Sequence, residues 1–87
     1  MRIWVKLFKE NRLLRDTMVI DNGEDTRTHK VFSAVEKSCL EFDIPKPIWL
    51  DVNIRDFKRY ARCRFSQDSF IEQVDFDYMD FHLIEED

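Results

Sequence analysis

Residues 2–9 read RIWVKLFK, and every second side chain of this stretch is apolar. This period of two is typical of a β-strand that presents one apolar face, formed here by Ile3, Val5 and Leu7. The opposite face is mixed, because Trp4 and Phe8 alternate there with charged side chains. The stretch therefore predicts a strand that has one face in the core and aromatic rings on the other.

The next apolar stretch predicts the partner of this strand. Apolar character resumes over residues 12–20 after a short polar break, in which Asn11 is the residue most tolerant of a positive φ angle. We predict a β-hairpin with strands 2–9 and 12–20. Asp21-Asn22-Gly23 ends it with a turn signal that uses the only glycine of the chain.

Residues 26–43 carry the pattern of an amphipathic helix. Threonines and acidic residues at 24–28 suit a helix N-terminus. An apolar stripe follows at spacings of four, four and three, made of Val31, Val35, Cys39 and Phe42 and widened by Phe32 and Leu40, with Lys30 off the stripe. The helix must end at Ile44-Pro45-Lys46-Pro47, since proline has no N–H to donate.

The remaining elements are shorter. Ile48-Trp49-Leu50 forms either an edge strand or a plug under the helix. Asn53 is the expected N-cap of a second helix that ends near Arg64, and Ser66 is the expected N-cap of a helix of one or two turns. Residues 76–84 are rich in aromatic and apolar side chains and predict a last strand that pairs with the hairpin.

Together these elements predict the α+β class, in the order ββα(αα)β. We expect the helices to lie on one face of an antiparallel sheet of three or four strands. A chain of 87 residues supports one core, so residues 1–87 form a single domain. Only the acidic end, Glu85-Glu86-Asp87, is expected to be disordered.

Composition excludes several classes of protein. Apolar residues make up 44% of the chain and charged residues 37%, which favours a soluble fold, and a single glycine excludes glycine-rich phosphate-binding loops. Charge interrupts the first apolar run too early for a secretory signal, and no run is long enough to cross a membrane. We therefore expect a cytoplasmic protein with Cys39 and Cys63 as reduced thiols.

The formal charge of −4 conceals two opposite blocks. Residues 44–67 hold six basic and two acidic side chains, whereas residues 68–87 hold eight acidic side chains and no lysine or arginine. Within the basic block, cations and aromatic rings interleave as they do in nucleic-acid-binding segments: Arg55, Lys58, Arg59, Arg62 and Arg64 with Tyr60 and Phe65. Because the acidic block repels phosphate, we favour a solvated or internally paired basic segment and keep nucleic-acid binding as the alternative.

Catalytic and metal signatures are weak. Asp75-Phe76-Asp77 places two carboxylates on one face of an extended segment, but no third ligand can be assigned. Cys63 is the more interesting thiol, because the flanking cations Arg62 and Arg64 would lower its pKa, yet no acid or histidine is tied to it. We predict no enzyme activity, no catalytic residues, no metal site and no cofactor.

The aromatic residues of the second sheet face are the strongest functional lead. A short chain rarely covers both faces of a sheet, so Trp4, Phe8 and Tyr78 are candidates for an interface with another protein or with a second copy. The competing interpretation is that lysine and arginine stems, or the Trp49 segment, cover these rings. The predicted function is that of a non-catalytic protein that acts through protein–protein contact. A homodimer that forms through the open sheet face is one form of this prediction.

Overall fold

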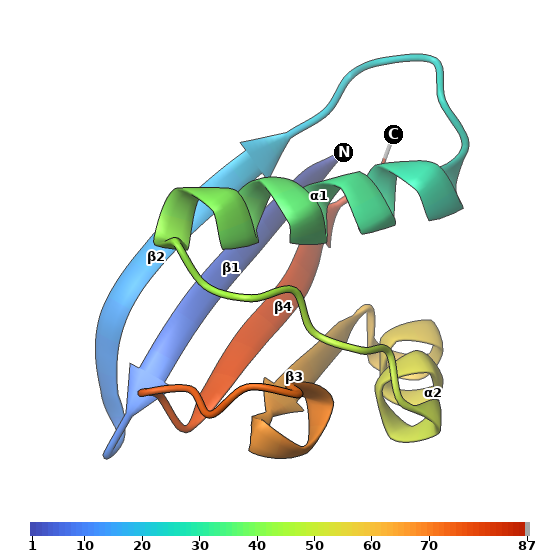
Figure 1. The fold of residues 1–87 in the computed structure, drawn as a ribbon. Coiled ribbons are helices and arrows are strands. Elements are labelled where there is room, and N and C mark those ends of the chain that lie inside the picture. Colours follow the sequence, from blue (N-terminus) through green and yellow to red (C-terminus); the bar gives the residue numbers. More distant parts are fainter. Residues whose placement is uncertain (87) are drawn as a thin grey trace.

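The computed structural model describes residues 1–86 and contains a four-stranded antiparallel sheet and two α-helices (Figure 1). The strands are β1 (Arg2–Lys9), β2 (Arg12–Ile20), β3 (Arg62–Ser66) and β4 (Tyr78–Glu85), in the sheet order β2-β1-β4-β3. The helices are α1 (Arg27–Phe42) and α2 (Asp51–Tyr60), and a single 3₁₀ turn, η1, covers Gln67–Ser69. The predicted α+β class, with its hairpin, long helix and C-terminal strand, is confirmed.

The hairpin has the predicted boundaries. Its two-residue turn places Glu10 at φ 52° and Asn11 at φ 63°, the left-handed conformations that match the twist of a tight hairpin. The Glu10 amide also donates to a carboxylate oxygen of Asp77 over 2.8 Å, which ties the turn to the start of β4. The single glycine, Gly23, follows β2 and donates its amide to Asp21 over 3.0 Å.

The core lies between the sheet and α1. Cross-strand register places Val5 beside Phe81 and Phe81 beside Cys63, so that one face of all three strands is apolar. Buried members of this face include Ile3, Val5, Leu7, Cys63, Phe65, Met79, Phe81 and Leu83. The helix covers them with Val31, Ala34, Val35, Ser38, Cys39 and Phe42.

The buried stripe of α1 differs from the predicted one. Phe32 and Leu40 were expected to widen it, but they are 51% and 76% exposed, and Lys30 is buried instead. The small residues Ala34 and Ser38 are 1% and 0% exposed. The predicted stripe of Val31, Val35, Cys39 and Phe42 is thus widened by these two residues, and not by Phe32 and Leu40.

Residues 48–50 are a plug and do not form a strand. Within the described chain they have no strand pairing, and the Trp49 ring inserts against Phe65 and Phe81 with ring centroids 4.8 and 6.0 Å away. The indole also meets Phe32 of α1 and Phe57 of α2. This segment thus packs against both helices and against the sheet.

The prediction that the second helix reaches Arg64 was wrong. The helix ends at Tyr60, and Ala61 follows at φ 56°. The chain then continues as β3, which is the edge strand beside β4. Cys63 and Phe65 point into the core while Arg62 and Arg64 point away, a period of two that five residues are too few to reveal. The helix also begins at Asp51, and not after an Asn53 cap.

The end of the described chain belongs to the sheet. Glu85 is the last residue of β4, and the Glu86 carboxylate accepts a hydrogen bond from Arg27 Nε over 3.0 Å. The expectation of disorder at Asp87 concerns a residue outside the described part of the chain.

Candidate interaction surface

The face of the sheet opposite the helices is not covered by either α1 or α2 (Figure 1). We call it the open face. Register assigns fifteen side chains to it, namely Arg2, Trp4, Lys6 and Phe8 of β1, Leu13, Asp16, Met18 and Ile20 of β2, Arg62, Arg64 and Ser66 of β3, and Tyr78, Asp80, His82 and Glu85 of β4. The structure thus brings residues of the predicted interface and of the predicted nucleic-acid set onto one surface.

The predicted interface residues Trp4, Phe8 and Tyr78 all lie on the open face, and each is partly buried. Phe8 and Tyr78 are cross-strand neighbours whose rings stack with centroids 5.3 Å apart. The Arg64 guanidinium lies 4.5 Å from the centre of the Tyr78 ring. The three side chains form a continuous stacked strip across β1, β4 and β3.

Trp4 is held by two polar neighbours. Its indole Nε1 donates to Asp16 Oδ2 over 2.9 Å, and the Lys6 ammonium lies 3.8 Å from the ring centre. The charged ends of Lys6 and Arg64 therefore lie over the Trp4 and Tyr78 rings, where the competing interpretation expected the lysine and arginine stems. The Trp49 segment does not, because it packs on the helix side.

Exposed aliphatic side chains lie on β2 of the open face, where Leu13 is opposite Phe8, Met18 is opposite Trp4 and Ile20 is opposite Arg2. They are 49%, 37% and 57% exposed. The solvated face of an antiparallel sheet ordinarily carries polar side chains. The open face instead also carries aliphatic and aromatic side chains. The alternating pattern of the sequence predicted this mixed character only for β1.

A buried carboxylate lies at the centre of the open face. Asp80 is 1% exposed, and Arg62 donates to both of its oxygens, over 2.9 Å from Nε and 2.5 Å from Nη2, while Lys6 Nζ lies 3.4 Å away. Burial alone would raise the pKa of Asp80, but the Arg62 hydrogen bonds and the Lys6 charge hold that pKa below its usual value. Burial, with the nearby Arg62 charge, lowers the pKa of His82, so this imidazole is neutral at pH 7.

The predicted nucleic-acid contacts are divided between different parts of the fold. Only Arg62 and Arg64 reach the open face. Arg55, Lys58 and Arg59 belong to α2, with Arg55 paired to Asp56 over 3.5 Å. Tyr60 is 61% exposed at the end of α2, whereas Phe65 has no exposed surface and is therefore unable to stack on a base.

Cys63 does not have the lowered pKa that its basic neighbours suggested. Burial raises its pKa to about 12, and the charges of Asp56 and Asp80 add to the effect. Its side chain points into the core while both flanking arginines point to the other face. Burial likewise raises the pKa of Cys39 to about 11, so both thiols are protonated at neutral pH.

Among residues 1–86 no three histidine, cysteine or acidic side chains are grouped as metal ligands. Asp77 of the predicted carboxylate pair bonds the hairpin turn, and Asp75 is exposed. In the same part of the chain no helix has the length and apolarity of a membrane span.

Comparison of the chain with protein-family models, with curated proteins and with solved structures gives no match.

Proposed function

We propose that this protein is a non-catalytic cytoplasmic protein that associates with a second copy of itself through the open face. The observation that carries the proposal is the apolar and aromatic area on a sheet face that neither helix covers. The two buried thiols, Cys39 and Cys63, are unpaired, which supports a reducing compartment.

Charge layout favours a second copy as the partner. One row across the sheet runs Asp16, Lys6, Asp80, Arg64, from β2 through β1 and β4 to β3, with alternating sign. A two-fold axis parallel to the strands reverses this row, so that Asp16 of one copy meets Arg64 of the other. Both of these terminal side chains are exposed, and the surface is complementary to itself.

The size of the face sets the expected strength. Four strands spaced by about 4.8 Å, of which the two central ones have eight residues rising about 3.3 Å each, give a face of at most roughly 19 by 26 Å, or about 500 Å². This area is smaller than the roughly 800 Å² that each partner buries in a stable interface of standard size. We therefore expect a dimer with a dissociation constant in the micromolar range, roughly 10–100 μM.

Charge reversal at the two ends of the row tests the proposal. Asp16→Arg and Arg64→Asp each place like charges opposite one another and should shift sedimentation equilibrium toward monomer, with dimer affinity lowered about tenfold. An equimolar mixture of the two variants restores both opposite-charge contacts and should recover a heterodimer. Matched controls are Glu36→Arg on α1 and Lys46→Asp in the following loop, which change exposed charges on the helix side.

Wild-type protein that sediments as a monomer at about 500 μM, well above the expected dissociation constant, would refute the dimer. So would two variants whose mixture is no more associated than either alone, because the rescue depends on the specific facing of residues 16 and 64.

The contact between Arg64 and Tyr78 favours single-stranded nucleic acid as a second candidate ligand. A cation beside stacked aromatic rings on central strands is a common platform for unpaired bases. Asp80 weakens this candidate, since its carboxylate occupies Arg62. Anisotropy of a labelled single-stranded RNA at low salt tests it: binding that falls with salt and is lost in both Tyr78→Ala and Arg64→Ala would support this candidate, and no anisotropy change would remove it.

A further inference from the structure

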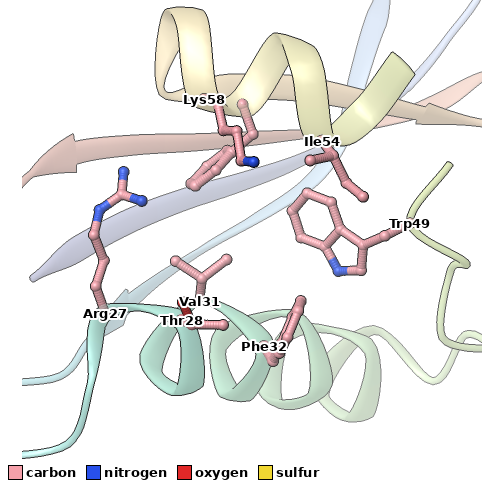
Figure 2. Close-up of a pocket in the computed structure, with 8 residues that line it drawn as sticks. Arg27, Thr28, Val31, Phe32, Trp49, Ile54 and Lys58 are labelled. Atoms are coloured by element: carbon pink, nitrogen blue, oxygen red, sulfur yellow. The ribbon is translucent and has the colours of Figure 1, made fainter. Parts of the chain in front are cut away.

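A pocket lies on the helix side of the sheet. Figure 2 shows a pocket between α1 and α2, with Arg27 rising from one helix, Lys58 descending from the other, and Trp49 closing one end. Its volume is about 180 Å³. It is separated from the open face by the sheet and the core.

The walls of this pocket are largely apolar and held by ring contacts. The Trp49 ring stands edge-on to Phe32 and to Phe57, with centroids 5.9 and 5.7 Å away. Val31 of α1 and Ile54 of α2 complete the apolar part of the lining. Because Phe57 and Val31 are anchored in the core, the pocket is preformed and does not need to open when a ligand enters.

Two cations give the pocket its polarity. Arg27 lies 5.5 Å from the centre of the Phe57 ring, and its hydrogen bonds to described residues use only Nε, which donates to Glu86. Lys58 forms no ion pair within residues 1–86. The two terminal nitrogens of Arg27 and the ammonium of Lys58 therefore remain available to an anion, and Glu86 already shows that a carboxylate is accepted at the rim.

We propose that this pocket binds a small organic acid in which one carboxylate is attached to a single aromatic ring or branched aliphatic group. The size follows from the volume, since a dry apolar cavity of about 150 Å³ in another protein accommodates benzene. The charge follows from Arg27 and Lys58, which hydrogen-bond and neutralise the carboxylate while the ring contacts Trp49 and Ile54. Glu86 competes with the ligand for Arg27.

Calorimetric titration with phenylacetate, with neutral phenylacetamide as the matched probe, tests this assignment. For a ligand of this size we expect a dissociation constant of roughly 0.1–1 mM, and binding of the amide at least about tenfold weaker. Nuclear magnetic resonance localises the site, because the indole N–H signal of Trp49 should move while that of Trp4, on the open face, should not.

Variants of α2 provide the second arm. Lys58→Met retains the aliphatic stem and should weaken phenylacetate binding about tenfold, whereas Arg59→Met, on the same helix outside the pocket, should leave it unchanged. Glu86→Gln should strengthen binding by removing the competing carboxylate.

Three results would each overturn the proposal: no heat or Trp49 shift at about 10 mM phenylacetate, equal affinity for the acid and its amide, or equal effects of Lys58→Met and Arg59→Met. None of them bears on self-association, because every residue changed lies outside the open face.

Discussion

Asp80 is the residue whose sequence context was most misleading. It belongs to an acidic block of eight carboxylates in residues 68–87, and most such groups are solvated. Strand register instead places it opposite Lys6 of β1, and Arg62 of β3, which lies opposite the neighbouring His82, reaches it diagonally; both cations neutralise it. One member of the acidic block is thus internal to the fold, and the exposed charge of that block is smaller than the sequence count.

Replacement of this carboxylate should destabilise the protein. Asp80→Asn leaves Lys6, which is 8% exposed, without its counter-ion, so the free energy of unfolding at pH 7 should fall by about 2–3 kcal/mol. Urea denaturation followed by circular dichroism measures this change. Asp75→Asn, an exposed change in the same acidic block, should alter stability by less than about 0.5 kcal/mol.

The same substitution should change the acid response. The pKa of Asp80 is lower in the folded than in the unfolded state, so its stabilisation is complete above the unfolded value near pH 4 and is lost as the pH falls through the folded value. Wild type should therefore lose stability more steeply than Asp80→Asn as the pH falls below about 4. Parallel curves for the two proteins would contradict the assigned ion pair.

At the scale of elements, a helix or strand can be predicted from the sequence when its hydrophobic pattern is long enough. The hairpin strands and α1 each provide eight or more residues, enough for a period of two or of 3.6 to be distinguished. β3 has only five residues and directly follows a helix, and its Phe65 continues the spacing of four that Phe57 and Ala61 begin. Local sequence therefore could not separate the helix from the strand; pairing with β4 decides it.

The hairpin turn offers a gain in stability. Glu10 occupies a left-handed conformation that costs a non-glycine residue about 1 kcal/mol, and asparagine followed by glycine suits both turn positions better. Glu10→Asn combined with Asn11→Gly should raise the free energy of unfolding by about 1 kcal/mol, measured by urea denaturation. Asn22→Gly, at a position without positive φ, should give no gain; an equal gain there would show that the turn conformation is not responsible.

At the scale of the whole molecule, one core joins both halves of the chain. Cys39 of α1 and Cys63 of β3 are 2% and 3% exposed within the same buried cluster. A single cooperative core predicts that both thiols become reactive only when the molecule unfolds globally.

Thiol labelling checks this cooperativity. In the single variants Cys39→Ala and Cys63→Ala, the remaining thiol should react with a disulfide reagent at a rate set by the unfolding equilibrium measured for that variant. The protection factors should then agree within about threefold after correction for stability. Much faster labelling of Cys63 would show that the α2 and β3 edge opens by itself.

The sequence by itself determined the hairpin, the long helix, the C-terminal strand and the mixed character of β1, because these follow from periodicity within single segments. It also placed Trp4, Phe8 and Tyr78 correctly on the face away from the helices. Only the tertiary structure decided that Arg62 and Arg64 share this face, that Asp80 is buried among cations, and that Trp49 closes a pocket between the helices. Each of these depends on which strand lies beside which, and contacts between segments far apart in the chain leave no period in the sequence of either segment.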